Sequence, residues 1–337
     1  MKKKVIEIVI ILFICISIFL LLTKRNAKHE YTSNLSYMDI NIYVKFYSSN
    51  KKVAKKALET IETLYQDYYE LSDPYNHYEG KTNLYDILHN TSKEEYIEID
   101  SRLYEMISYG MELFEKSNGL LDIRMGNVID IWKTYRDIGI GIPNIEELMV
   151  AKNNTITDIV LKEGNLIKNN HPNLDLRIMI RGYATEKVGE YLESIGIDEY
   201  IINTDGNIKV GKHYNHSMYS IGIENPDSKI GDIYKIVYGN NMSVVSSGGY
   251  HKYYQYNQKQ YHSIINPNTL FPPNYCKSVT VLVKDSIVGD ALSTALFLLP
   301  IEEGIQLVED MENTEAIWYT NNNTEIKTKG FTKYEIQ

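Results

Sequence analysis

The segment Gly289-Asp290-Ala291-Leu292-Ser293-Thr294-Ala295-Leu296 combines the apolar pattern of a buried helix with a carboxylate and a hydroxyl four residues apart. Residues at this spacing lie on one helix face, so Asp290 and Thr294 point the same way. The neighbouring Ala and Leu side chains supply a face that packs against the rest of a domain. The two oxygen ligands suit a hard cation such as Mg2+. An Asp early in a helix, however, more often interacts with the helix dipole, and a Thr is often a surface residue.

The composition is that of an ordinary globular protein. With 337 residues, 43% apolar and 23% charged, the chain is long enough for one large domain or two small ones. A formal net charge of -9 excludes nucleic acid as a partner, because a nucleic-acid surface normally carries a clustered basic patch. Cys15 and Cys276 lie far apart in the sequence, so no disulfide framework is implied.

The N-terminus predicts a membrane segment. Lys2, Lys3 and Lys4 precede an apolar run over residues 5–22, and no small-x-small cleavage site follows it. We therefore interpret residues 1–23 as a transmembrane anchor or uncleaved signal, residues 24–35 as a polar tether and residues 36–337 as one domain. The basic N-terminus favours a single-pass protein of the cell membrane with its main domain outside the cytoplasm.

The periodicity of the main domain predicts an α+β fold. Alternating apolar residues over 36–47 indicate a half-buried first strand, and helical spacing over 51–71 indicates an amphipathic helix. A second helix begins at Ser101, which we expect to cap it, and ends before Gly119. From residue 155 short strands joined by hairpins dominate, interrupted by one helix over 183–195. We expect mostly antiparallel sheets packed by helices.

Four further segments concentrate small or polar residues where a strand meets a turn, which is where ligand sites are commonly built. They are residues 175–184, 203–208, 246–250 and 261–272. Each has a simpler interpretation: the arginines as surface charges, the Asn-Gly elements as hairpin turns, and His262 as a hydrogen-bonded strand residue.

The order and spacing of these segments, together with Asp290 and Thr294, resemble the ApbE family of FAD:protein FMN transferases. That family carries D-x-G-G-I-A-K-G-Y-A, N-x-G-G-[DN]-I, T-S-G-x-Y, H-x-I-[DN]-P-x-T-G-x-P and D-A-L-[AS]-T-A-L segments, and counterparts of all five occur here in order. Leu120-Leu121-Asp122 and Trp132 resemble an upstream G-x-F-D...W element, and residues 37–40 resemble an early M-G-T element. The resemblance spans most of residues 36–337 and implies an ApbE-like, T-fold-like domain.

The resemblance also implies an activity and its residues. The family splits the pyrophosphate of FAD, attaches FMN to a Ser or Thr hydroxyl of a target flavoprotein and releases AMP. The target that the resemblance implies here is a subunit of a membrane redox complex. The implied Mg2+ ligands are Asp290, Thr294 and the carbonyl of Ile180, and His262 either helps proton transfer or orients phosphate oxygens. The implied FAD-binding residues are Met38, Asp122, Arg181, Tyr183, Asp205, Gly206, Ser247, Gly248 and Thr269.

Several positions depart from the family pattern. The paired glycines of the first segment are Arg177 and Ile178, its lysine is Arg181, the first glycine of the second segment is Asp205, and the glycine before the last proline is replaced at Leu270. Side chains at the glycine positions are expected to change the backbone path or fill the pocket. The alternative hypothesis is therefore a catalytically impaired flavin-nucleotide binder or interaction module at the membrane. A third is hydrolysis of FAD to FMN and AMP.

Overall fold

The computed structural model describes residues 27–37, 40–155, 159–228 and 231–335. The strands are β1 His29–Tyr37, β2 Ile40–Ser48, β3 Tyr96–Glu98, β4 Leu161–Lys162, β5 Leu166–Lys168, β6 Tyr200–Thr204, β7 Asn207–Val210, β8 Tyr219–Glu224, β9 Ile233–Gly239, β10 Met242–Gly248, β11 Tyr253–Tyr256, β12 Lys259–His262, β13 Ser278–Val283, β14 Glu315–Tyr319 and β15 Glu325–Lys327. The helices are α2 Lys51–Leu71, α3 Leu84–Leu88, α4 Ser101–Lys116, α5 Gly126–Ile138, α6 Ile145–Thr155, α7 Ile180–Ser194, α8 Ser286–Leu298 and α9 Ile301–Glu309, with a 3-10 turn η1 at Phe331–Tyr334.

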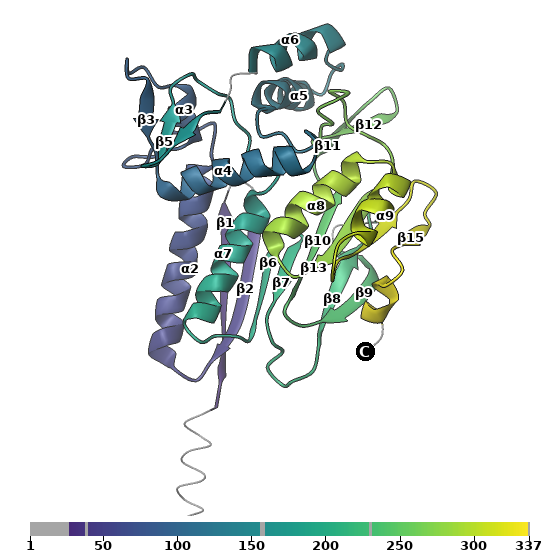
Figure 1. Cartoon of the computed structure of the whole chain (residues 1–337). Helices are drawn as coiled ribbons and strands as arrows, with labels where there is room; N and C mark the ends of the chain where they lie inside the picture. Colours follow the sequence, from purple (N-terminus) through teal and green to yellow (C-terminus); the bar gives the residue numbers. More distant parts are fainter. Residues whose placement is uncertain (1–26, 38–39, 156–158, 229–230, 336–337) are drawn as a thin grey trace, which may run out of the picture.

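The central element of the fold is an eight-stranded sheet in the order β1-β2-β6-β7-β10-β13-β14-β15. All of its neighbouring strands pair antiparallel. Helices α2, α7 and α8 cover one face of this sheet (Figure 1). The predicted α+β fold with antiparallel strands is therefore confirmed.

Helix α8 is the most buried helix of this layer. From Gly289 to Leu298 every residue is buried, because α8 packs on β10 and β13 on one side and on α7 on the other. Its N-cap is Asp285, whose side chain accepts hydrogen bonds from the amides of Ile287 and Val288. The cap fixes where the helix begins and hence which turn presents Asp290 and Thr294.

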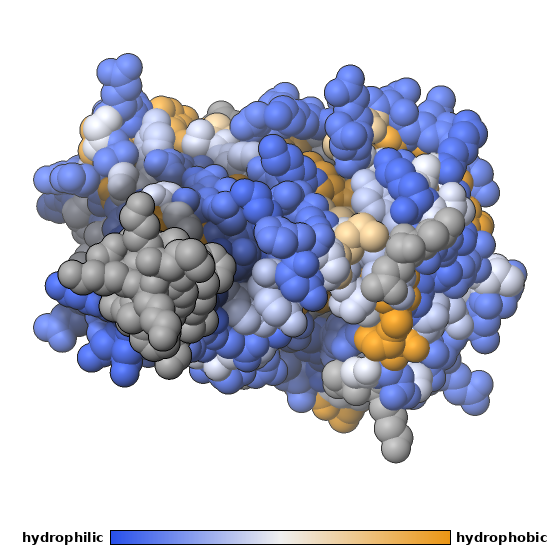
Figure 2. Space-filling model, turned by 90° about the horizontal axis from the view of Figure 1, so that it is seen from below, coloured by the Kyte–Doolittle hydropathy of each residue, from blue (hydrophilic) through white to orange (hydrophobic). Residues whose placement is uncertain are grey.

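The opposite face of the sheet is covered by the hairpin β8–β9 and by η1. Ile221, Val237 and Phe331 pack there against Val244 and Leu282 of the sheet. The end of the molecule at which the described chain begins is largely hydrophilic when viewed from below, with only small separate apolar patches (Figure 2).

Two local predictions need correction. Residues 29–35, which we predicted to be part of a tether, belong to strand β1 and pair with β2, while the strand predicted over 36–47 corresponds mainly to β2. The N-cap of α4 is Asp100, which accepts a hydrogen bond from the Arg102 amide, and Ser101 is the first helical residue. The predicted membrane segment lies outside the described residues, and none of the helices described is long and apolar enough to cross a bilayer.

Candidate active site

A cavity of about 420 Å3 opens at one end of the helical layer. Its walls come from the loop after α2, from α5, from the N-terminus of α7, from the end of β10 and from α8. The cavity is lined by segments that are far apart in sequence. Two of them meet because α7 and α8 pack side by side (Figure 1). Of the residues predicted to form the site, it is lined by Asp122, Ile180, Arg181, Asp205, Ser247, Gly248 and Thr294.

The contact between α7 and α8 positions Asp290 directly under the cavity wall. A Cβ atom added at Gly182 would lie 2.3 Å from the carbonyl oxygen of Ser286, so only glycine permits this approach. The Gly182 amide donates to Oδ2 of Asp290 at 2.8 Å, and Nη2 of Arg181 donates to Oδ1 at 3.2 Å. Burial raises the pKa of the Asp290 carboxyl, while Arg181 and the Gly182 amide act in the opposite direction.

A row of hydroxyl groups continues from Asp290 along the same wall. Oγ of Ser247, on β10, lies 2.9 Å from Oγ of Ser293 and 3.4 Å from Oγ1 of Thr294. Thr294 is one helical turn beyond Asp290 and reaches the cavity surface. Carboxylate and hydroxyl oxygens therefore converge near the N-terminus of α7, where Ile180 is the first helical residue.

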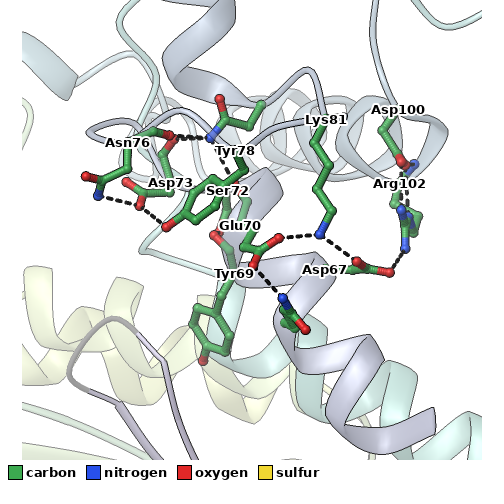
Figure 3. Close-up of polar contacts among 12 residues, drawn as sticks. Asp67, Tyr69, Glu70, Ser72, Asp73, Asn76, Tyr78, Lys81, Asp100 and Arg102 are labelled. Atoms are coloured by element: carbon green, nitrogen blue, oxygen red, sulfur yellow. Dashed lines mark hydrogen bonds and ion pairs between the residues drawn. The ribbon is translucent and has the colours of Figure 1, made fainter.

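The loop between α2 and α3 forms a wall that the sequence did not reveal. Asp73 is only 1% exposed and accepts hydrogen bonds from Asn76 Nδ2 at 2.9 Å and from Tyr78 Oη at 2.8 Å (Figure 3). Lys81 bridges Asp67 and Glu70 and so ties the loop to the end of α2 (Figure 3). These bonds hold a polar loop in one conformation against the cavity.

Tyr75 of this loop lines the cavity and lies close to two cations. Nζ of Lys133 lies 3.6 Å from its ring centroid, and the Arg177 guanidinium lies 5.9 Å from it. Its hydroxyl donates to Asp130 at 3.0 Å. With Arg136 also lining the cavity, the wall offers an aromatic face and positive charges, which suit a ligand with planar rings and phosphates.

Comparison with known proteins agrees with this arrangement. The sequence profile of the ApbE family matches residues 37–318. The chain belongs to the ApbE family.

Relatives and solved structures of the family extend the match. An FAD:protein FMN transferase of Vibrio cholerae is 27% identical over 248 residues, covering 71% of this chain and 73% of that protein. One of Haemophilus influenzae is 27% identical over 299 residues, covering 83% of each. The ApbE protein of Thermotoga maritima superimposes with a TM-score of 0.79 at 19% identity, covering 92% of this chain and 100% of that one. The flavin transferase ApbE of Vibrio cholerae superimposes with a TM-score of 0.73 at 21% identity, covering 91% of this chain and 100% of that one. At these identities the two structures establish the fold.

The replaced glycines of the ApbE pattern do not close the cavity. Arg177 and Ile178 both avoid positive φ values, so their backbone does not require glycine. The Arg177 guanidinium turns back onto Asp175, with Nε 2.9 Å and Nη2 2.6 Å from Oδ2. Our expectation that these side chains would fill the pocket is therefore wrong, since they lie along its wall. The expected change of the backbone path stays a prediction.

Two other departures from the ApbE pattern lie together. Asp205 has a φ of 49°, a left-handed conformation that glycine adopts more easily than other residues. The Arg181 guanidinium contacts both Asp205 and Asp290. Its Nη1 donates to the Asp205 carbonyl at 3.3 Å, and its Nη2 donates to the Asp290 carboxylate. The additional carboxylate at 205 and the larger cation at 181 thus occur as neighbours.

Several residues predicted for the site do not line the cavity. The ring of His262 packs under Gly249; Nε2 donates to the Pro273 carbonyl at 2.9 Å and Nδ1 accepts from the Ile264 amide at 3.3 Å. Burial lowers the pKa of His262. The Tyr183 hydroxyl donates to Glu105 at 3.1 Å, away from the cavity. Gly206 with a φ of 90° serves the β6–β7 turn and Thr269 is exposed on a loop, while Met38 lies outside the described residues.

Proposed function

We propose that this chain is a Mg2+-dependent FAD:protein FMN transferase. It would transfer FMN from FAD to a Ser or Thr hydroxyl of a target protein and release AMP. The observation that carries the proposal is the open cavity at which the family segments meet, with Thr294 in its α8 wall and Asp290 buried directly beneath that wall. The names of the relatives, FAD:protein FMN transferase, support the same reaction.

The donor set fits the proposed metal. Mg2+ prefers oxygen ligands and usually keeps water or substrate phosphates in its remaining positions. Asp290, Thr294 and the Ile180 carbonyl offer only oxygen ligands. Of these residues, Ile180 and Thr294 line the cavity. The bound ion would supply neutralisation of the negative charge on the pyrophosphate. Arg181 must then release Oδ1 of Asp290, and the phosphates of FAD give its guanidinium a new partner.

The proposed transfer moves one phosphorus between two oxygens. The acceptor hydroxyl oxygen forms the new bond to the FMN phosphorus, the bond to the bridging oxygen breaks, and AMP leaves with that oxygen. The hydroxyl proton is released in the same step. With both ring nitrogens bonded to backbone groups, His262 in this conformation positions the Ser247–Gly249 segment rather than accepting that proton.

We further propose that the protein is held at the cell membrane by residues 1–23. The main domain would lie outside the cytoplasm and act on a flavoprotein subunit of a membrane redox complex. Protease treatment of intact spheroplasts should degrade the main domain, and its protection would contradict this orientation.

The activity is tested with the full chain in detergent, FAD, Mg2+ and a flavin-accepting redox subunit. We expect a covalently fluorescent acceptor and equimolar AMP. Asp290→Asn should abolish both, whereas Asp310→Asn, an exposed carboxylate at the end of α9, should not. Absence of transfer across several acceptors would count against the proposal.

A non-catalytic flavin binder is the second candidate, favoured by the ion pair that Arg181 forms with Asp290. Calorimetry separates the two. FAD binding that is unaffected by Mg2+, without AMP release, would support a binder. AMP release without an acceptor would instead reveal hydrolysis.

A further inference from the structure

Helices α5 and α6 and the loop between them carry an exposed apolar ridge. We define the ridge as Ile138, Ile140, Ile142, Ile145, Met149 and Val150, whose exposed fractions run from 37% at Ile142 to 72% at Ile140. All six lie within residues 138–150. Several large apolar side chains exposed within so short a segment often mark an interaction surface.

The loop that carries the ridge is anchored to the layer beneath it. Gly139 and Gly141 adopt φ values of 73° and 82°, which turn the chain sharply after α5. The Tyr254 hydroxyl donates to the Gly141 carbonyl at 3.1 Å, and Tyr254 stacks on Tyr261 of β12. The isoleucines are therefore held outward by a fixed backbone.

The ridge begins at the end of the helix that lines the active-site cavity. Helix α5 lines that cavity with Trp132, Lys133 and Arg136, and Arg136 lies two residues before the first ridge residue. On its other side α5 borders a groove of about 590 Å3, lined by Asn127, Ile131, Glu146, Glu147, Val150 and Ala151. A polypeptide lying on the ridge and in this groove would therefore pass beside the cavity.

The position of the ridge favours a protein partner over the anchoring membrane. The described chain begins at the start of β1, at the end of the molecule opposite α5 and α6 (Figure 1). The predicted membrane segment precedes that point, and the face of the protein at that end is largely hydrophilic (Figure 2). A domain held from there presents the ridge away from its own membrane.

We propose that the ridge and the adjoining groove form the docking site for the acceptor polypeptide, a proposal that rests on the proposed transferase function. The docking segment would present apolar side chains to the ridge and a Lys or Arg to Glu146 and Glu147 in the groove. Docking there would bring the accepting hydroxyl to the mouth of the cavity. The same surface would distinguish target proteins from water as acceptors.

Site-specific photo-cross-linking tests the partner. The full chain carrying benzoyl-phenylalanine at position 140 is irradiated in its native host, and the same probe at position 236 on β9 is the control, since Ile236 is 47% exposed but distant from α5. We expect position 140 to cross-link to a protein that bears covalent FMN, and position 236 not to. Cross-links only to lipid, to a second copy or to proteins without flavin, or no cross-link, would overturn the proposal.

Transfer kinetics, with the acceptor protein that cross-linking identifies as the substrate, provide the second measurement. Ile138→Ser/Ile140→Ser should raise the KM for the acceptor at least tenfold and leave the dissociation constant of FAD unchanged, whereas Ile233→Ser/Ile236→Ser should change neither. Normal FAD binding and transfer with no effect of the ridge variant would refute the docking site alone. Failure of the wild-type chain to bind FAD would refute the proposed function itself.

Discussion

Replacing Arg181 by methionine should increase the affinity of the FAD-free site for a divalent cation. Arg181 lies 3.2 Å from Oδ1 of Asp290, so an ion bound about 2 Å from that oxygen would be about 5 Å from the guanidinium charge. For charges of two and one, Coulomb's law gives a repulsion of about 2 kcal/mol at water-like screening and about 7 kcal/mol at an effective dielectric constant of about 20. Displacement of the arginine relieves part of this repulsion. We expect affinity to rise at least tenfold, which corresponds to about 1.4 kcal/mol.

The assay is calorimetric titration of Mn2+ into the full chain in detergent without FAD. Arg177→Met is the matched control, because Arg177 pairs with Asp175 and does not contact Asp290. The metal-free Arg181→Met variant should also be less stable by about 3 kcal/mol, since a buried carboxylate loses its partner, and Mn2+ should restore its melting temperature. Equal Mn2+ affinities for a folded Arg181→Met variant and the wild type would refute the competition between guanidinium and metal.

Three further predictions concern other groups. Asp205→Gly removes a carboxylate from the cavity wall and also a non-glycine residue in a left-handed conformation. Because the carboxylate repels the phosphates of FAD, the variant should bind FAD roughly two- to fivefold more tightly in a fluorescence titration. Unchanged affinity would show that Arg181 already neutralises this charge. Arg102 hydrogen bonds lower the pKa of Asp100, and although burial opposes it, hydrogen bonds from Lys81 and Arg102 lower the pKa of Asp67 (Figure 3). The stabilisation that these two ionised carboxylates contribute is present above their unfolded pKa of about 4 and is lost as the pH falls through their lower folded pKa values. Arg102→Met should therefore lower the free energy of unfolding by about 1–2 kcal/mol at pH 7 and by less at pH 3, as measured by urea unfolding. An equal loss at both pH values would contradict this. Burial raises the pKa of the Cys276 thiol to about 12. Iodoacetamide at pH 8 should therefore alkylate Cys276 roughly a hundredfold more slowly in the native protein than after denaturation, as measured by mass spectrometry. Equal rates would show that the thiol is accessible.

The fold could be predicted wherever one side of an element is buried. Helix α2 was predicted with its observed bounds because Ala57, Ile61 and Tyr65 recur on its buried face. Strand β1 was missed because it lies at the edge of the sheet and carries polar residues such as Thr32, Ser33 and Asn34, which an edge strand tolerates.

The candidate site could be predicted only as a set of segments. The sequence placed Asp290 and Thr294 on one helix face and identified Ser247 and Arg181, all of which the fold brings together. It could not reveal that Arg181 holds Asp290, because that contact depends on the distance between two helices. Tyr75 was also missed, since a tyrosine in a polar loop carries no periodic signal.

The close contact at Gly182 has a consequence for how far this sequence can diverge. A side chain there would have to displace the backbone of Ser286 and the Cβ atom of Asp290 together, so the gap between two helices, rather than a flexible loop, sets the geometry of the carboxylate. Arg177, Ile178 and Asp205 show that loop positions can change while the cavity persists. In distant relatives, the loss of this helical glycine would therefore be a better sign of an abandoned site than the loss of the loop glycines.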